Sequence, residues 1–398
     1  MSDPTSLQQI QAGTPAFWKA AIALSTGSFT TFTLLHSPQP ILPQLANEFA
    51  VSPGVASLSM SAGTTGMALS LIPLAMMADR FGREKLMRIG VFGSAIFSML
   101  CALANDFTTL LVLRALLGMF SACVPAAAVA YLGDEIAASA RGKAVGLYIA
   151  GNALGGMFGR LVAAIVTGWL GWRSSLLILG LVGIAGAFLF AKLLPPPRFF
   201  SSSHLVWSSL FADIRRVYGE RTLPLLFIVG FLLMGSFVAM YNYLGFRLSE
   251  SPYNLAPSAV GSVFLLYAIG SFACAKSGEL ADRHGYRRIA FIFSCLMAAG
   301  LAVSLFESLA VVVVGLAIFT IGYFGVFTVC NAWVGRLASH RKAMISALFF
   351  SSAYMGSGIL GSTVGIPWAT WGWPGVVVTL GMAISLIAAI FLFFTSTE

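Results

Sequence analysis

The sequence contains few charged residues. Only 9% of the 398 residues are Asp, Glu, Lys or Arg, whereas 58% are hydrophobic. Soluble domains carry about 25% charged residues, so a chain of this length has too few polar side chains to cover a water-exposed surface. The composition therefore excludes a soluble globular protein and indicates an integral membrane protein.

The sequence also lacks the residue groups on which enzymes depend. Its five cysteines are scattered singly inside apolar runs, a spacing that fits neither a metal site nor a disulfide framework. No nucleophile–base group, metal cluster or phosphate loop is evident, so we expect neither an enzyme nor a cofactor. No signal peptide is evident either, because the first apolar run is long enough to span and no small-residue cleavage site follows it.

Long apolar runs make up most of the chain. A helix that crosses a bilayer needs about 20 mainly apolar residues. Twelve segments meet this condition, and the fold class they predict is all-α and integral to a membrane. The predicted spans are 18–40, 55–77, 88–105, 109–132, 144–169, 174–194, 222–247, 257–278, 289–306, 309–334, 343–368 and 374–394.

The net charge of +9 comes from basic residues that are unevenly distributed among the loops between these spans. The intervening loops hold little more than Arg173 and Arg247, while Lys and Arg gather in alternate loops, at 80–88, 141–143, 192–221, 276–288 and 336–342. Cytoplasmic loops carry such an excess, so both termini are predicted to be cytoplasmic. The basic excess is an orientation signal, and no nucleic-acid partner is expected.

The chain is duplicated. "MMADRFGREK" at 76–85 follows the second span and "ELADRHGYRR" at 279–288 follows the eighth. An even number of spans in each half makes the halves parallel repeats, as in many transporters that bind substrate between their repeats. We therefore predict two six-helix bundles, at 1–194 and 222–398, joined by a linker at 195–221.

The linker begins with three prolines, which end the sixth span. An apolar stripe with charged residues opposite then predicts an amphipathic helix on the cytoplasmic membrane surface. This helix is a simple tether or, alternatively, a regulatory lipid sensor. Its apolar residues are Trp207, Leu210, Phe211, Ile214 and Val217, and its charged residues are Asp213, Arg215 and Arg216.

Five motifs in the correct order resemble the major facilitator superfamily. Both copies of the repeated decapeptide are similar to its G-x-L-A-D-R-x-G-R-K signature. "LRALLGMF" (113–120), "LGDEIAASARGKAVGLY" (132–148) and "GNALGGMFGR" (151–160) resemble its fourth-span arginine, its acidic loop and its fifth-span antiporter motif. "QPILPQL" (39–45) and "PLLFIVGFLLMGSF" (224–237) are similar to the YnfM-type inner-membrane branch, which is grouped with drug:proton antiporters.

The resemblance implies a cytoplasmic gate. Asp79 and Asp282 would accept hydrogen bonds from the N-terminal amides of a helix in the opposite half, the eleventh and the fifth span respectively. Gly82 and Gly285 would permit the turn, and Arg83 and Arg287 would pair with acids such as Asp134 or Glu135 and their counterparts. The alternative is a solvated loop that only fixes topology. The remaining gate candidates are Arg80, Arg141 and Arg283.

Gly151, Gly155 and Gly159 give the fifth span a face without side chains, against which another helix can pack closely. We expect this face to form a rigid seam between the halves. Gly156 replaces the family's proline and Arg160 its last glycine, which weakens the antiporter inference.

Two arginines lie inside predicted spans, where a charge costs about 2.5–3.5 kcal/mol and normally faces a cavity or a partner. The family's fourth-span arginine, here Arg114, is linked to proton coupling; Arg160 faces the cavity or pairs with a helix-end carbonyl. No carboxylate lies mid-membrane. His36 is either the proton-coupling group or a hydrogen-bonded histidine near the outer interface.

Such an interior disfavours cations and favours anionic, zwitterionic or neutral aromatic solutes. Other polar side chains within spans are candidate cavity lining or simple packing residues. They are Gln39, Asn152, Tyr241, Asn242, Tyr243, Tyr323, Asn331 and Tyr354.

The leading hypothesis is a monomeric, proton-driven exporter of small organic compounds in the inner membrane, working by alternating access. The second is a proton-coupled uptake symporter of a small organic anion or nutrient. The third, a non-transporting membrane receptor, is disfavoured because no extramembrane domain is large enough to signal. The sequence does not identify the substrate.

Overall fold

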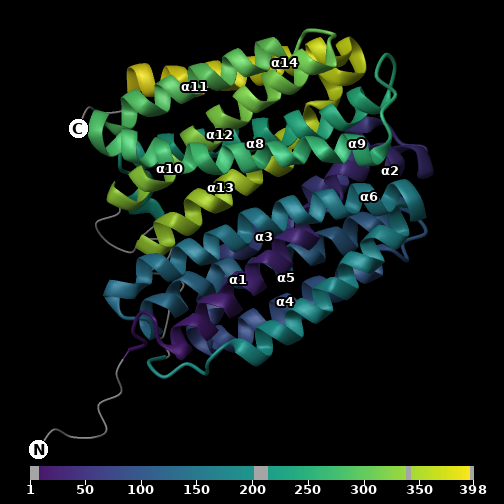
Figure 1. The fold of residues 1–398 in the computed structure, drawn as a ribbon. Helices are drawn as coiled ribbons and strands as arrows, with labels where there is room; N and C mark the ends of the chain where they lie inside the picture. Colours follow the sequence, from purple (N-terminus) through teal and green to yellow (C-terminus); the bar gives the residue numbers. More distant parts are fainter. Residues whose placement is uncertain (1–8, 201–213, 338–341, 395–398) are drawn as a thin grey trace, which may run out of the picture.

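The computed structural model describes residues 9–200, 214–337 and 342–394, and helices form nearly all of this part (Figure 1). The first half contains α1 (Pro15–His36), η1 (Gln39–Ile41), α2 (Leu42–Glu48), α3 (Pro53–Phe81), α4 (Arg83–Cys101), α5 (Phe107–Glu135) and α6 (Ala138–Leu193). The second half contains α8 (Thr222–Ser249), α9 (Pro257–Ser262), η2 (Val263–Leu265), α10 (Leu266–His284), α11 (Tyr286–Val303), α12 (Leu309–Leu337), α13 (Lys342–Thr363), α14 (Gly365–Ala389) and η3 (Ile390–Phe394).

The predicted membrane spans are present. Within the described residues, nine helices are long and apolar enough to cross a bilayer. One of them, α6, crosses twice, because Gly171 breaks it with φ +81°. The 22 residues of α1 and the 19 of α4 add two further crossings. The last boundary differs from prediction: α13 ends at Thr363, and α14 begins at Gly365 with a break at Gly372.

The two halves form separate bundles that lie side by side, the first purple to teal and the second green to yellow (Figure 1). They meet where α3 packs against α13 and where α6 packs against α9. We call the end of the bundles that carries Asp79 and Asp282 the motif end, and the opposite end, with η1 and α9, the far end.

Turns and caps set the helix boundaries at both ends. The repeated motif turns at Gly82 (φ +105°) and Gly285 (φ +89°), a region that only glycine enters without strain. At the far end, Asp106 caps α5 by accepting from the Thr109 hydroxyl at 2.6 Å and its amide at 2.8 Å. The hydrogen bond from the Thr109 hydroxyl is the main reason that the pKa of the Asp106 carboxyl lies below its usual value, and the bond from the Thr109 amide adds to it.

The motif end includes two segments outside the spans. Ile10 forms a parallel bridge with Ile136, so the chain before α1 is fastened to the loop between α5 and α6. Most of the predicted amphipathic helix, including Trp207, Leu210, Phe211 and Asp213, lies outside the described residues. Its last part, 214–218, is helical.

Candidate functional site

One buried arginine lies at the seam between the halves, toward the far end. Arg160 is 4% exposed, and its Nε donates to Oε1 of Gln39 at 2.6 Å. The Gln39 amide donates to Oδ1 of Asn242 at 2.9 Å and to the Val238 carbonyl at 3.2 Å, both on α8. The Asn242 amide donates to the Gly361 carbonyl at 3.3 Å. A continuous polar chain therefore joins α6 and η1 of the first half to α8 and α13 of the second.

Aromatic rings of the second half face the same guanidinium. The Arg160 Cζ lies 4.8 Å from the ring centre of Tyr267 and 5.4 Å from that of Phe264. Tyr241 and Phe237 pack behind them, with ring centres 5.0 and 5.2 Å from that of Tyr267. A cation–π contact that is shielded from water contributes about 2 kcal/mol. The aromatic rings of the second half therefore attract the Arg160 guanidinium of the first half.

Positive charge dominates the interior. Within the described residues, the buried charged side chains are those of Arg114, Arg160 and Glu135. Glu135 lies at the last position of α5, at the motif end. The membrane-embedded part of the first half therefore carries two arginines against no buried acid among the described side chains.

Arg114 serves the packing of its own half. Its Nε donates to the Ser59 carbonyl at 3.0 Å and its Nη1 to the Leu34 carbonyl at 3.1 Å, and Nη2 donates to the Leu35 carbonyl. These bonds tie α5 to α3 and α1. The geometry gives Arg114 a positioning role, and its role in proton coupling stays a prediction.

His36 is buried close to Arg160. Its Nδ1 donates to the Phe32 carbonyl one turn earlier at 3.1 Å, and its ring stacks on Phe32 with centroids 5.5 Å apart. Gly156 brings the two side chains near one another: a Cβ built there would lie 3.1 Å from Nη1 of Arg160 and 4.0 Å from Nδ1 of His36.

The adjacent residues Tyr241, Asn242 and Tyr243 on α8 have separate hydrogen-bond partners. Successive side chains on a helix point about 100° apart, and these three separate accordingly. The Tyr241 hydroxyl bonds Thr320 Oγ1 at 2.7 Å within the second half, Asn242 joins the polar chain, and the Tyr243 hydroxyl donates to the Ser362 carbonyl at 3.0 Å.

The other predicted lining residues occupy different levels of the bundle. Tyr323 and Tyr354 are buried, whereas Asn152 and Asn331 are half-buried. Tyr323 stacks on Phe237 with ring centres 3.7 Å apart. Asn152 is two turns from Arg160 on the same face of α6, and its Oδ1 has no hydrogen-bond partner among the described residues.

The first copy of the repeated motif forms an ion cluster. Arg83 donates from Nε and Nη2 to Oδ1 of Asp79 at 3.2 and 3.0 Å, and from Nη1 to the Ala130 carbonyl at 2.8 Å. It also pairs with Asp134. All four residues belong to the first half. The proposed partner of Asp79, the start of the eleventh span, adjoins residues 338–341 outside the described part, so the bond across the halves stays a prediction.

Glu135 fastens the start of the linker instead of pairing with Arg83. Its Oε1 accepts the backbone amides of Arg198 and Phe199 at 2.7 and 2.9 Å. Arg141 donates to the Gly133 carbonyl at 2.6 Å, which holds the loop between α5 and α6. The remaining motif arginines, Arg80 and Arg283, are exposed.

The second copy of the repeated motif, at 279–288, forms different contacts from the first. Asp282 is exposed, and its Oδ1 accepts from the Tyr286 hydroxyl at 2.6 Å. Arg287 donates from Nε to the Phe391 carbonyl at 2.6 Å and also to the Leu392 carbonyl. This corrects the expectation that Arg287 pairs with an acid: the π-helix η3, which follows α14, leaves carbonyls that accept from it.

The glycine face of the fifth span packs inside the first half. A Cβ added at Gly155 would lie 2.2 Å from the Phe29 carbonyl oxygen of α1, and Gly151 and Gly159 approach α1 in the same way. The expectation of a seam between the halves is therefore corrected. The backbones of α1 and α6 touch within one bundle, and this contact fixes the base from which Arg160 projects.

Three comparisons place the chain among known proteins. Residues 24–362 match the model of the Major Facilitator Superfamily. The chain is 36% identical to "Uncharacterized MFS-type transporter YybF" of Bacillus subtilis over 92% of this chain and 91% of that one. It is also 36% identical to "Inner membrane transport protein YnfM" of Escherichia coli, over 93% and 88%. A bacterial homolog of the human lysosomal transporter Spinster, inward-facing and occupied, shares the fold with a TM-score of 0.78 at 17% identity, over 95% and 96%.

Proposed function

Because the chain belongs to the major facilitator superfamily and is thus a multi-pass membrane transporter of small molecules rather than an enzyme, we propose that it exports small organic compounds in exchange for protons. Transport proceeds by alternating access between the two halves. The favoured cargo is anionic or zwitterionic and carries an aromatic or apolar body.

The junction at Arg160 is the observation that supports this proposal. One cation bonds Gln39 and faces the rings of Tyr267 and Phe264 in the other half. An anionic substrate competes with Gln39 for the guanidinium, and its aromatic part competes for the same rings. Substrate binding and closure of the far end then use the same groups, which gives the substrate differential affinity for the two states, as a conformational switch requires.

Asn152 extends the site toward the motif end. It shares a face of α6 with Arg160, and its Oδ1 is buried without a partner among the described residues. A buried, unpaired amide oxygen costs about 1–3 kcal/mol, and a donor on the substrate, such as an ammonium, hydroxyl or amide group, removes this cost. Arg160 and Asn152 together suit a zwitterionic or hydroxylated aromatic acid.

The orientation that the basic loops favour defines which side of the membrane each end of the bundles faces in the proposed export cycle. The positive-inside asymmetry puts the motif end and both termini in the cytoplasm of a bacterial cell with an inner membrane. The inter-half contacts at Arg160 then seal the periplasmic side, and substrate enters from the cytoplasm. His36 is the candidate proton-coupling group, because histidine is the side chain that changes charge near neutral pH; the adjacent Arg160 guanidinium opposes its protonation.

Replacing Arg160 by glutamine tests the proposal. We expect Arg160→Gln to abolish proton-driven transport of aromatic acids in proteoliposomes, with Arg160→Lys retaining part of it, since lysine keeps the charge but not the planar fork. Arg173→Gln, which removes a half-buried far-end cation that pairs with Glu48 away from the seam, is the matched control and should transport normally. The substrate is found first by screening toxic organic acids for altered minimum inhibitory concentration on deletion and overexpression.

Transport in inverted and right-side-out vesicles tests direction. Accumulation in inverted vesicles, driven by an inside-acid gradient, supports export. Accumulation only in right-side-out vesicles would establish uptake by proton symport instead. Full activity of Arg160→Gln would show that Arg160 does not bind the substrate, whichever direction of transport the vesicles reveal.

A further inference from the structure

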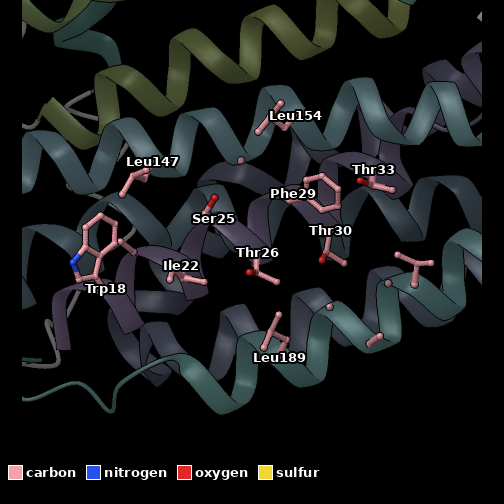
Figure 2. Close-up of a pocket in the computed structure, with 16 residues that line it drawn as sticks. Trp18, Ile22, Ser25, Thr26, Phe29, Thr30, Thr33, Leu147, Leu154 and Leu189 are labelled. Atoms are coloured by element: carbon pink, nitrogen blue, oxygen red, sulfur yellow. The ribbon is translucent and has the colours of Figure 1, made fainter. Parts of the chain in front are cut away.

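The first half carries a groove on its surface that the transport cycle does not explain (Figure 2). It has a volume of about 530 Å³, lies between α1 and both arms of α6, and is lined entirely by residues of the first half. Figure 2 shows Leu154 on one arm of α6 and Leu189 on the other, with the α1 side chains between them. The rims are exposed: Ile22 by 47%, Leu154 by 54% and Leu189 by 46%. In a bilayer these rims face acyl chains.

The groove has the shape of a channel for a flexible apolar chain. Its lining includes the small residues Ala21, Gly151, Gly183 and Gly186, and at the three glycines α6 packs closely on neighbouring helices, so that few side chains rise from the floor of the groove. On α1 it extends from Trp18 to Thr33, about 22 Å at 1.5 Å per residue. One leaflet of a bilayer has a hydrocarbon depth of about 15 Å, so an acyl chain of that leaflet fits along it from the motif end.

The end of the groove nearest the motif end is basic. Lys143 Nζ lies 4.8 Å from the centre of the Trp18 ring, which closes that end. Lys19 is exposed beside Trp18, and Lys192 is exposed one turn beyond Leu189. Three ammonium groups thus gather at the level where a tryptophan typically marks the membrane interface.

The nearby carboxylates are already engaged. Glu84 pairs with Arg88 at 2.6 Å, Asp134 pairs with Arg83, and Glu135 accepts the linker amides. Within the described residues no ion pair engages these three lysines, so their positive charge faces the adjacent leaflet, and an anionic headgroup complements it.

We propose that this groove binds an acidic phospholipid of the leaflet at the motif end. One acyl chain lies along α1 between the arms of α6, and the phosphate contacts Lys19, Lys143 and Lys192. A zwitterionic lipid of the same chain length fits the groove but carries no net negative charge for the lysines. Each basic residue near an anionic membrane surface contributes about fivefold to binding.

The test is native mass spectrometry of the full chain in detergent, titrated with palmitoyl-oleoyl phosphatidylglycerol or with phosphatidylcholine carrying the same chains. We expect at least fivefold tighter binding of phosphatidylglycerol. The triple variant Lys19→Gln, Lys143→Gln, Lys192→Gln should lose this preference and keep its phosphatidylcholine binding. Lys276→Gln, an exposed lysine of the second half at the same end, is the matched control and should behave as wild type.

A second variant tests the groove itself. Ala185 lines it and is exposed, so Ala185→Phe fills the space without burying new bulk in the bundle; Ala299→Phe, at an exposed alanine of α11, is its control. We expect Ala185→Phe to weaken both lipids at least fivefold. Equal binding of the two lipids by wild type, or unchanged lipid binding by the lysine variant or by Ala185→Phe, would each overturn the proposal.

Discussion

Replacing Gly155 with alanine measures how closely α1 and α6 are packed. The new Cβ would lie 2.2 Å from the Phe29 carbonyl oxygen and 2.6 Å from the Phe29 Cα, whereas ordinary contact begins at 3.4 Å. The helices must therefore separate by about 1 Å, because backbone atoms cannot rotate away as side chains do. The Thr33 hydroxyl, which donates to the Gly155 carbonyl at 3.0 Å, loses this bond as they part.

The expected loss of stability follows from these two changes. Overpacking costs about 1–3 kcal/mol, and an interhelical hydrogen bond within a membrane contributes about 0.6 kcal/mol. Together they predict a loss of roughly 2–3.5 kcal/mol. Arg160 lies one turn beyond the contact on the same helix, so transport should fall as well.

The assay is thermal unfolding of the purified protein in detergent. We expect an apparent Tm at least about 4 °C lower for Gly155→Ala, since 1 kcal/mol shifts the Tm of a 150–250-residue domain by about 2–4 °C. Gly146→Ala is the control, because it lies on the same helix and a Cβ at that position would meet nothing within 4 Å. Equal Tm values for the two variants would refute the reasoning that backbone contact with α1 explains the glycine face.

Three further changes have defined outcomes. Glu135→Ala should release the amides of Arg198 and Phe199 and speed tryptic cleavage after Arg198, while Glu135→Gln keeps an acceptor and is cleaved more slowly; equal rates would show that the bond does not hold the linker. Asp79→Asn should slow transport at normal expression, and unchanged transport would count against the gate. Arg114→Ala leaves three carbonyls of α1 and α3 without their donor and should both stop transport and lower the Tm; a fully active variant would contradict its positioning role.

The spans and the duplication were predictable because they depend on local properties. Apolar length defines a span wherever it occurs, and the turn after each repeated motif needs a glycine at positive φ. Gly82 and Gly285 meet this requirement in both halves. These features require no knowledge of which helices become neighbours.

The partners of the site residues depend on tertiary packing, and here sequence was a weaker guide. Nothing in a chain with 32 phenylalanines and 10 tyrosines distinguishes Tyr267 and Phe264 as the rings that face Arg160. The glycine face predicted close packing correctly but not that its partner is α1. Adjacency in the sequence does not predict shared partners either, because neighbours on a helix point in different directions, as the separate contacts of Tyr241, Asn242 and Tyr243 illustrate.

The two halves share a fold but divide the chemistry between them. The first half supplies the buried cations, Arg114 and Arg160, and the second supplies the rings of Tyr241, Tyr267 and Tyr323. The buried arginine and the rings that face it come from different halves, because Arg160 belongs to the first half and Tyr267 and Phe264 to the second. We infer that an aromatic anion is bound fully only where the halves meet. Moving the arginine to the second half by exchanging Arg160 and Phe264 should therefore preserve the local charge and ring, yet abolish the competition with Gln39 that links substrate binding to opening of the far end.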